Sequence, residues 1–355
     1  MTRSRDTANT QENVGGSLPP FTAGKNAIIN GDFRINQRAF SSTTTSGIYT
    51  FDRWNVVYSG GTCTYSTQAF TPGAAPVTGY ESTNFLRTVS ASQSATTHYA
   101  AFRQPIEDVR TFAGQTVTVS FWAKASTGTP SVAITLDQTF GSGGSSNNPK
   151  SGSNITISSS WARYSSTITL DSVSGKTIGT GSCLYAWLFT SCGSAVNSGV
   201  GYPVTLGVQN ITVDVWGFQV EAGSVATPFT TATGTIQGEL AACQRYYVRT
   251  TASANNAQTP FGYGYFYSST GTVLIIRPPV TMRTTPSFTF SYCGLTNTSG
   301  GNMVLSGSPS NYYSTADVVQ VTQNSATAQT TGQFTTLAGS NASSGTGYVE
   351  LSAEL

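Results

Sequence analysis

Aromatic residues at alternate positions carry the clearest chemical signal in this sequence. Between Leu184 and Phe189 the chain alternates strictly between aliphatic and aromatic residues. The aliphatic set is Leu184, Ala186 and Leu188, and the aromatic set is Tyr185, Trp187 and Phe189. Because alternate residues of a strand face opposite sides of a sheet, we expect one aliphatic and one aromatic face. An aromatic face suits sugars, since pyranose rings stack on flat side chains and offer hydroxyl groups for hydrogen bonding.

Four side chains are therefore candidates for glycan binding. Tyr185 and Trp187 lead, and for both of them sugar binding and filling a core are evenly balanced alternatives. Trp122 joins them because its strand pattern places it opposite the Val and Phe residues of that strand. His98, the only histidine, is either a hydrogen-bonded surface residue or a ligand contact.

The acidic residues of the first two thirds of the chain do not form a recognisable catalytic set. A glycosidase needs two carboxyl groups on either side of the scissile bond, one of them with a raised pKa. The available residues are Glu107, Asp108, Asp137, Asp171, Asp214 and Glu221, for which structural roles are favoured. No GxSxG motif accompanies His98, and Leu170 replaces the first glycine of a phosphate-binding loop ahead of Lys176. We predict no enzyme activity, no metal and no cofactor.

The composition predicts an all-β protein. Only 9% of the 355 residues are charged, against a usual quarter, and Ser, Thr, Gly and Asn fill the difference. This mixture suits sheet surfaces and turns rather than helices. Seventeen basic and fifteen acidic residues give a net charge of +2. Neither a nucleic acid nor a membrane is therefore an expected partner.

The five cysteines show no paired CxxC spacing, and their number is odd. Zinc is not expected from this pattern, and at least one thiol must be free. Cys183 and Cys192 could close a short loop, but buried free thiols are the favoured interpretation.

Residues 1–24 are polar, contain paired glycines and prolines, and show no periodicity. They are expected to form an arm, which is either a disordered tail or an attachment peptide that becomes ordered against a larger particle. The segment has no apolar stretch that would act as a secretion signal, so we expect the chain to be made in a cytoplasm.

Residues 25–233 alternate short β patterns with Gly, Ser and Asn turns, which predicts an antiparallel sandwich. The expected strands are Ala27–Phe33, Trp54–Tyr58, Cys63–Gln68, Asn84–Val89, Ala100–Pro105, Thr116–Ala123, Ser131–Leu136, Arg163–Leu170, Leu184–Thr190 and Val204–Val220. A long loop is expected from Gly141 to Asn154.

Residues 234–248 are expected to form a helical connector. Ile236, Leu240, Cys243 and Tyr247 share one face of a helix spanning Thr235–Tyr247. This stripe should pack either on the sandwich or against other copies of the chain.

Residues 249–355 are expected to form a second, smaller β-sandwich. In Phe261–Tyr267 the aromatic residues Phe261, Tyr263, Tyr265 and Tyr267 share a face opposite the glycines, and one side should be strongly buried. A domain of this size is near the lower limit for a self-sufficient core. Association as a homotrimer would cover its aromatic faces.

Several motifs together resemble a known family. The segment GQTVTVSFWAKAS, with AFRQPIEDVRTFA, NGDF, FDRW, SSSWARYSSTITL and DVWGFQVEAG, is similar to the jelly-roll carbohydrate-binding modules of xylanases and glucanases. The similarity is closest to the versions built into bacteriophage fibre and virion-surface proteins, and it covers Asn26 to Phe229.

The resemblance implies an opening strand at Asn30–Phe33 beside a closing strand at Val213–Trp216. Members of the family often bind a structural calcium where these strands meet, with an acidic residue directly after the Phe. This chain has Arg34 there, so the resemblance favours an ion pair of Arg34 with Asp214 or Asp32 instead of calcium.

The order of the sandwich, EAGSVATPF, GELAACQRYY and a β domain ending in AEL looks like phage fibre, spike and tail-associated proteins. It implies a non-enzymatic protein of the virion surface that is anchored to other virion proteins by residues 1–24 and binds a host surface polysaccharide. The alternatives are a capsid decoration or tail adaptor protein that binds no sugar and, third, a polysaccharide depolymerase.

Overall fold

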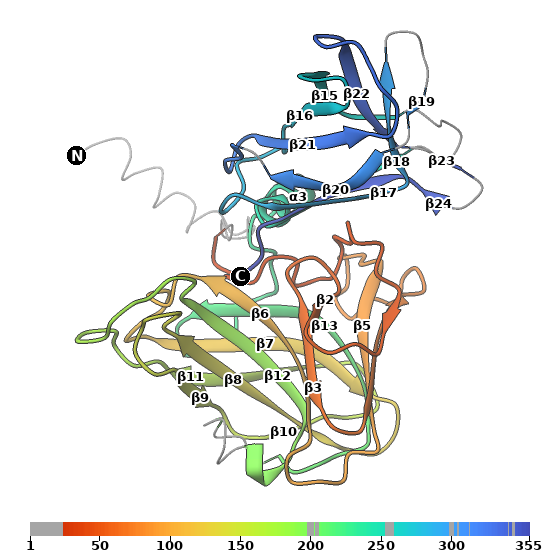
Figure 1. The fold of residues 1–355 in the computed structure, drawn as a ribbon. Helices are drawn as coiled ribbons and strands as arrows, with labels where there is room; N and C mark the ends of the chain where they lie inside the picture. The colour runs from red at the N-terminus through yellow and green to blue at the C-terminus, as the bar shows by residue number, and fades with distance from the viewer. Residues whose placement is uncertain are drawn as a thin grey trace, which may run out of the picture.

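The structure is a computed structural model that describes residues 24–196, 202, 206–252, 259–297, 302–303, 305–311, 313–339, 341–342 and 345–355. The arm expected at residues 1–24 lies outside these residues apart from Gly24. The described part is all-β, as predicted, and forms two domains with one helix between them (Figure 1).

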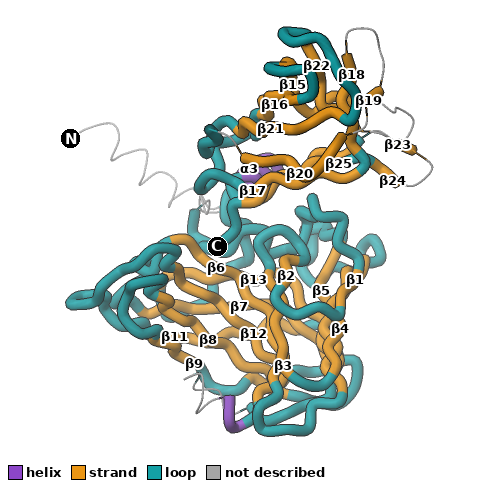
Figure 2. The backbone as a smooth tube through the Cα atoms, viewed as in Figure 1, coloured by secondary structure: helices purple, strands orange, loops and turns teal. Residues whose placement is uncertain are grey.

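The first domain is a sandwich of two antiparallel sheets, in which strands supply nearly all the regular structure (Figure 2). The first sheet has the order β1 (Ser42–Thr43), β4 (Thr62–Ala69), β5 (Asn84–Ala91), β13 (Thr212–Ala222), β7 (Thr116–Ala125) and β11 (Ala162–Thr169). The second has the order β10 (Ile155–Thr156), β8 (Ser131–Thr139), β12 (Cys183–Cys192), β6 (Tyr99–Glu107), β3 (Asn55–Ser59) and β2 (Ile48–Tyr49), with β9 (Asn148–Ser151) paired to β8.

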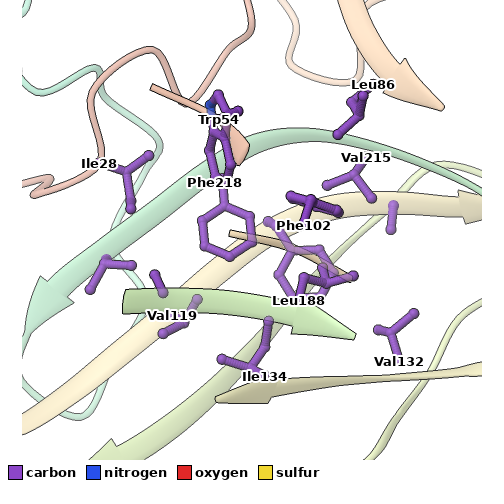
Figure 3. Packing of buried hydrophobic residues seen from close by; sticks show 14 of the residues in the cluster. Ile28, Trp54, Leu86, Phe102, Val119, Val132, Ile134, Leu188, Val215 and Phe218 are labelled. Atoms are coloured by element: carbon purple, nitrogen blue, oxygen red, sulfur yellow. The ribbon is translucent and has the colours of Figure 1, made fainter. Parts of the chain in front are cut away.

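The core lies between these two sheets. Strand β7 buries Val117, Val119 and Phe121 completely, which confirms its period-two pattern. Side chains from both sheets meet around Trp54 and Phe218, whose rings lie 5.3 Å apart (Figure 3). Apolar burial of this extent is the main stabilising contribution to a sandwich.

Three segments differ from the predictions. In the predicted strand Val204–Val220, of which Val204 and Thr205 lie outside the described residues, β13 begins only at Thr212. The predicted strand Ala27–Phe33 is a turn-rich loop, because Asn30 and Phe33 have φ of 57° and 55°, which no strand accommodates. It still runs beside β13, with the Ala27 amide donating to Val220 O over 2.9 Å. The predicted loop Gly141–Asn154 contains β9, which extends the second sheet by pairing with β8.

The helix α3 spans Ile236–Gln244, with Thr235 as its N-cap. Its buried residues are Glu239 and Cys243, whereas Ile236 is 40% exposed. The predicted apolar stripe is therefore only partly correct, because Tyr247 leaves the helix and begins β14. The Glu239 carboxylate accepts hydrogen bonds from the Asn30 and Thr233 amides, both at 2.7 Å, and so fastens the helix to the loop before β1.

The second domain encloses a smaller, separate core. Its first sheet has the order β14 (Tyr247–Thr251), β25 (Tyr348–Ser352) and β17 (Ser287–Ser291). The larger sheet has the order β19 (Asn302–Met303), β18 (Cys293–Asn297), β22 (Phe334–Gly339), β15 (Thr259–Phe266), β16 (Gly271–Ile276), β21 (Val319–Ser325) and β20 (Leu305–Asn311). Strands β23 (Asn341–Ala342) and β24 (Gly345–Thr346) pair with each other.

The tyrosines of β15 are exposed within the chain, which corrects the prediction that they form a strongly buried side. Tyr263, Tyr265 and Tyr267 are each at least half exposed, whereas Phe266 is fully buried. The glycines face inward, because a Cβ at Gly262 would lie 2.6 Å from Ile276 Cγ1 in the core. Because the inward-facing residues of β15 are glycines, β16 packs closely against this strand. The tyrosine side chains therefore lie on the outer face of the sheet.

A polar junction joins the two domains. The Arg53 guanidinium is 1% exposed, forms an ion pair with Glu354, and donates to Pro105 O over 2.6 Å. It also stacks on the Tyr246 ring at 3.4 Å from the centroid. Tyr49 Oη donates to Leu355 O over 2.8 Å. Residues next to α3 and the segment after β25 thus both contact the sandwich.

The cysteines are free thiols, as favoured from the sequence. Cys183 and Cys192 occupy opposite ends of β12, so the strand holds them too far apart for a disulfide. Burial raises the pKa of both thiols to about 11. In the part of the chain that the structure describes, no helix is long and apolar enough to span a membrane.

Candidate functional site

The outward face of the second sheet brings together the first two predicted glycan contacts. On β12, Leu184 and Leu188 belong to the main core, as predicted. Tyr185, Trp187 and Phe189 face the other way and form a second, smaller cluster. The Tyr185 and Trp187 rings lie 5.9 Å apart. The sequence pattern therefore identified both faces of this strand correctly.

The strand register places polar residues beside these rings. Trp187 pairs with Arg103 on β6, and Tyr185 pairs with Asp137 on β8. The Arg103 guanidinium lies 4.2 Å from the Tyr185 ring centroid and 4.5 Å from that of Trp187. Its Nε donates to Asn55 Oδ1 over 3.2 Å, which fixes the plane of the group. We call Tyr185, Trp187, Arg103, Asp137 and Tyr202 the sheet-face site.

Two buried polar atoms of the sheet-face site have no partner. Trp187 Nε1 and Asp137 Oδ1 make no hydrogen bond within the described structure, although both side chains are at least 97% buried. Buried polar groups are nearly always satisfied, so unpaired atoms of this kind are unusual. Sugar hydroxyls both donate and accept hydrogen bonds. In this site the accessible groups that suit a hydroxyl-rich ligand are the Tyr185 ring and the Arg103 guanidinium beside it.

The Trp187 ring itself is covered. It is 3% exposed, stacks on Phe189 at 5.3 Å between centroids, and contacts the Tyr202 ring at 5.1 Å. Tyr185 is partly exposed and supplies the accessible aromatic surface. Of the two alternatives for Trp187, its ring packs in a core, and its indole nitrogen is buried there without a hydrogen-bond partner among the described residues.

The other two predicted residues lie elsewhere. Trp122 is 9% exposed on the first sheet, against Trp216 at 5.4 Å and Phe229 at 6.0 Å between ring centroids. His98 lies in the turn before β6, where its Nδ1 accepts the Ser94 amide over 3.3 Å. A Cβ at Gly60, where φ is +67°, would overlap the His98 ring. The structure thus brings together two of the four candidates, and binding by any of them stays a prediction.

The sequence did not identify Arg103 and Tyr202 as site residues, and it indicated Asp137 only as a carboxylate for which a structural role was favoured over a catalytic one. Arg103 becomes a neighbour of Trp187 through the β6–β12 register, which no local pattern contains. Tyr202 Oη donates to Asp137 Oδ2 over 3.4 Å across 65 residues of sequence. Arg103 is a charged residue within a largely buried strand, and this was the only signal in the sequence that it belongs to a site.

Burial raises the pKa of Asp137 to about 6, and the Tyr202 hydroxyl and Arg103 offset part of this effect. The folded state therefore holds this proton more tightly than the unfolded chain, and stability is lost as the pH rises from the unfolded pKa of 3.8 through about 6. We expect Asp137→Asn to gain stability relative to the original chain over this interval, by at most about 3 kcal/mol. Urea unfolding of both proteins at a series of pH values measures this difference.

Asp52 titrates in the same range and is present in both proteins, so the comparison isolates Asp137. Parallel stability curves for the two proteins would show that Asp137 ionises freely in the folded state.

The residues of the suspected calcium position are paired with cations. Asp32 forms an ion pair with Arg34 Nε at 3.2 Å and accepts a hydrogen bond from the Tyr80 hydroxyl at 2.7 Å. Asp214 instead binds Arg87 at 2.7 Å. Of the two alternatives for Arg34, the pair with Asp32 is confirmed. Among the described residues, no group of three or more His, Cys, Asp or Glu side chains is arranged to hold a metal ion.

The sandwich is similar to carbohydrate-binding modules of known structure. The CBM22-1 xylan-binding domain from Paenibacillus barcinonensis matches with 12% identity and a TM-score of 0.32, over 57% of this chain and 98% of that one. The family 11 module from Clostridium thermocellum, in complex with a β-1,3-1,4-mixed-linked tetrasaccharide, matches with 12% identity and a TM-score of 0.31, over 53% and 99%.

A domain of bacteriophage CBA120 tailspike protein 4 also matches, with 12% identity and a TM-score of 0.33. That match covers 56% of this chain and 21% of the tailspike domain. Likenesses at this level assign no function. No protein-family profile and no curated protein sequence matches the chain.

Proposed function

We propose that the protein is a non-catalytic glycan-binding protein of a bacteriophage virion surface, which attaches the particle to a host polysaccharide through the sheet-face site. The observation that carries the glycan assignment is the partly exposed Tyr185 ring, with the Arg103 guanidinium 4.2 Å from its centroid and Asp137 paired with it in the strand register. An aromatic surface with a few convergent polar groups is typical of small-molecule sites. The virion role is supported by the motif order and composition of the sequence.

The carboxylates support the absence of catalysis. Five of the six candidates form ion pairs, namely Glu107 with Arg245, Asp108 with Arg110, Asp171 with Lys150, Asp214 with Arg87 and Glu221 with Lys25. Arg245 and Tyr246 lower the pKa of Glu107 despite its burial, which keeps it ionised. Of these six, Asp137 forms no ion pair and has a pKa raised to about 6, and a hydrolase needs a second free carboxylate opposite such a general acid.

Anchoring through residues 1–24 and assembly as a homotrimer belong to the same proposal. The trimer is supported by the exposed Ile236 on α3. Large exposed apolar patches commonly mark contact surfaces.

We expect Tyr185→Ala to weaken binding to an uncharged polysaccharide by roughly tenfold, the effect of losing one stacked aromatic ring. Migration in native gels that contain xylan or mixed-linked β-1,3-1,4-glucan measures the affinity. Val225→Ala is the matched control, because Val225 is 72% exposed and lies on a different loop.

Equal retardation of Tyr185→Ala and the original chain would contradict the assignment of this site. Retardation of neither protein by either polymer would favour a structural adaptor without sugar binding. Release of reducing ends from the polymers would instead favour a depolymerase.

A further inference from the structure

The outer face of the larger sheet in the second domain carries an exposed aromatic surface, which we call the tyrosine face. It consists of Tyr263 and Tyr265 on β15, Tyr267 directly after that strand, Ile275 on β16 and Phe334 on β22, with exposed fractions of 41–55%. Strands β15 and β22 lie at the end of the domain that is remote from the sandwich (Figure 1). This surface is therefore separate from the sheet-face site.

The strand register makes the tyrosine face continuous. Tyr263 pairs with Ile275 on one side, and Tyr265 pairs with Phe334 on the other. The Tyr263 and Phe334 rings are stacked, with centroids 6.1 Å apart and planes at 25°. Successive tyrosines of β15 are two residues apart and so are spaced by about 7 Å along the strand. The result is a row of flat rings in a single plane of the sheet.

Two hollows lie along this row, and Tyr265 lines both. The larger has a volume of about 630 Å³ and is lined by Tyr263, Tyr265, Ile275, Arg277 and Phe334, among others. The smaller, of about 460 Å³, lies between Tyr265, Tyr267, Gln320 and Thr322. Both volumes fall within the range of ligand sites, roughly 300–1,000 Å³.

The backbone of β15 is not available to a partner. β15 lies between β16 and β22 and is paired with both. A partner strand therefore cannot extend the sheet here, because strand addition needs a free edge. Whatever binds must use the side chains.

The side chains favour an uncharged ligand with many hydroxyl groups. Arg277 is the only charged residue that lines either of these two hollows, and Gln320 and Thr322 supply polar atoms at their margin. In the described structure, no hydrogen bond occupies the hydroxyl groups of Tyr263 and Tyr265. Ile275 and Val273 are the aliphatic residues that line these hollows, and the rest of their lining consists of aromatic, polar and glycine residues.

We propose that the tyrosine face is a second glycan platform, which stacks successive pyranose rings of an uncharged polysaccharide on Tyr263, Tyr265 and Tyr267. The rings supply the apolar contact, and the phenol, amide and hydroxyl groups around them bind the sugar hydroxyls. The platform is independent of the sheet-face site and would let one chain hold a polymer at two points.

The test uses the full chain and its tryptophans, all five of which lie in the first domain. Xylan and mixed-linked β-1,3-1,4-glucan are titrated by calorimetry and, in parallel, by tryptophan fluorescence. We expect Tyr185→Ala to lose the fluorescence change while retaining heat of binding. We expect Tyr265→Ala to retain the fluorescence change while its calorimetric affinity falls about tenfold. Tyr265→Phe should bind nearly as well as the original chain.

Tyr313→Ala is the matched control, because Tyr313 is 78% exposed and lines neither hollow. Heat of binding that is identical in Tyr265→Ala and the original chain, or absent for both polymers in Tyr185→Ala, would overturn the proposal.

Sedimentation provides the second readout. Conversion of an oligomer to a monomer by Tyr265→Ala would also overturn it and would identify the occupant as another copy of this chain. If the original chain shows heat of binding but no fluorescence change, the result would count against the sheet-face site and not against the tyrosine face.

Discussion

Replacing Arg53 by alanine is expected to lower the free energy of unfolding by about 3–5 kcal/mol, the range for breaking a buried ion pair. The guanidinium is 1% exposed and holds together Glu354, Pro105 O and the Tyr246 ring. Its removal leaves the largely buried Glu354 carboxylate with only Arg38, at 2.9 Å, as a cationic partner. Urea unfolding monitored by tryptophan fluorescence and by far-ultraviolet circular dichroism measures the loss.

The double variant Arg53→Met, Glu354→Leu provides a sharper comparison. It removes both charges together, so it should lose much less stability than Arg53→Ala. Arg110→Ala is the control, since its ion pair with Asp108 is solvent-exposed and should contribute nothing measurable. If Arg53→Ala unfolds at the same urea concentration as Arg110→Ala, the junction does not stabilise the folded chain.

Replacing Trp54 by alanine is expected to cost about 3–5 kcal/mol, because it empties the centre of the sandwich core. The indole is fully buried, and its ring lies within 5.4 Å of the Phe33, Phe102 and Phe218 rings. Its Nε1 donates to Asn30 O over 2.9 Å, which also fixes the opening loop. The shift in urea midpoint measures the effect.

Trp54→Phe keeps most of the ring and removes the hydrogen bond, so it should fold and show a smaller loss. Trp161→Ala is the matched control, because Trp161 is only partly buried at the edge of the same core. A smaller loss in Trp54→Ala than in Trp161→Ala would contradict the position of the core.

The strands were predictable where one face is apolar and the other polar. β7 is the clear case, since Val117, Val119 and Phe121 alternate with polar residues and are completely buried. The opening loop was not predictable in the same way. Asn30 and Phe33 adopt left-handed backbone conformations, which tertiary contacts such as the Asn30 amide to Glu239 impose.

The site was only half predictable, for a related reason. The alternation on β12 shows that Tyr185 and Trp187 share a face, but only the register with β6 and β8 adds Arg103 and Asp137. The same alternation at β15 indicated an aromatic face, but it did not indicate whether that face or the glycine face packs on the core. The glycine face packs on the core, because Gly262 lies so close to Ile276 that a side chain would not fit there. A close approach between two strands leaves no local signal in the sequence.

The central claim is that the sheet-face site binds sugar at the Tyr185 ring, next to the buried Trp187 indole. The most direct measurement is the indole N–H spectrum of the protein labelled with nitrogen-15 at its five tryptophans, with and without saturating mixed-linked β-1,3-1,4-glucan oligosaccharide. The account predicts that the Trp187 signal shifts, while that of Trp54, already bonded to Asn30 O, stays in place. An unchanged Trp187 signal at saturating oligosaccharide would contradict it.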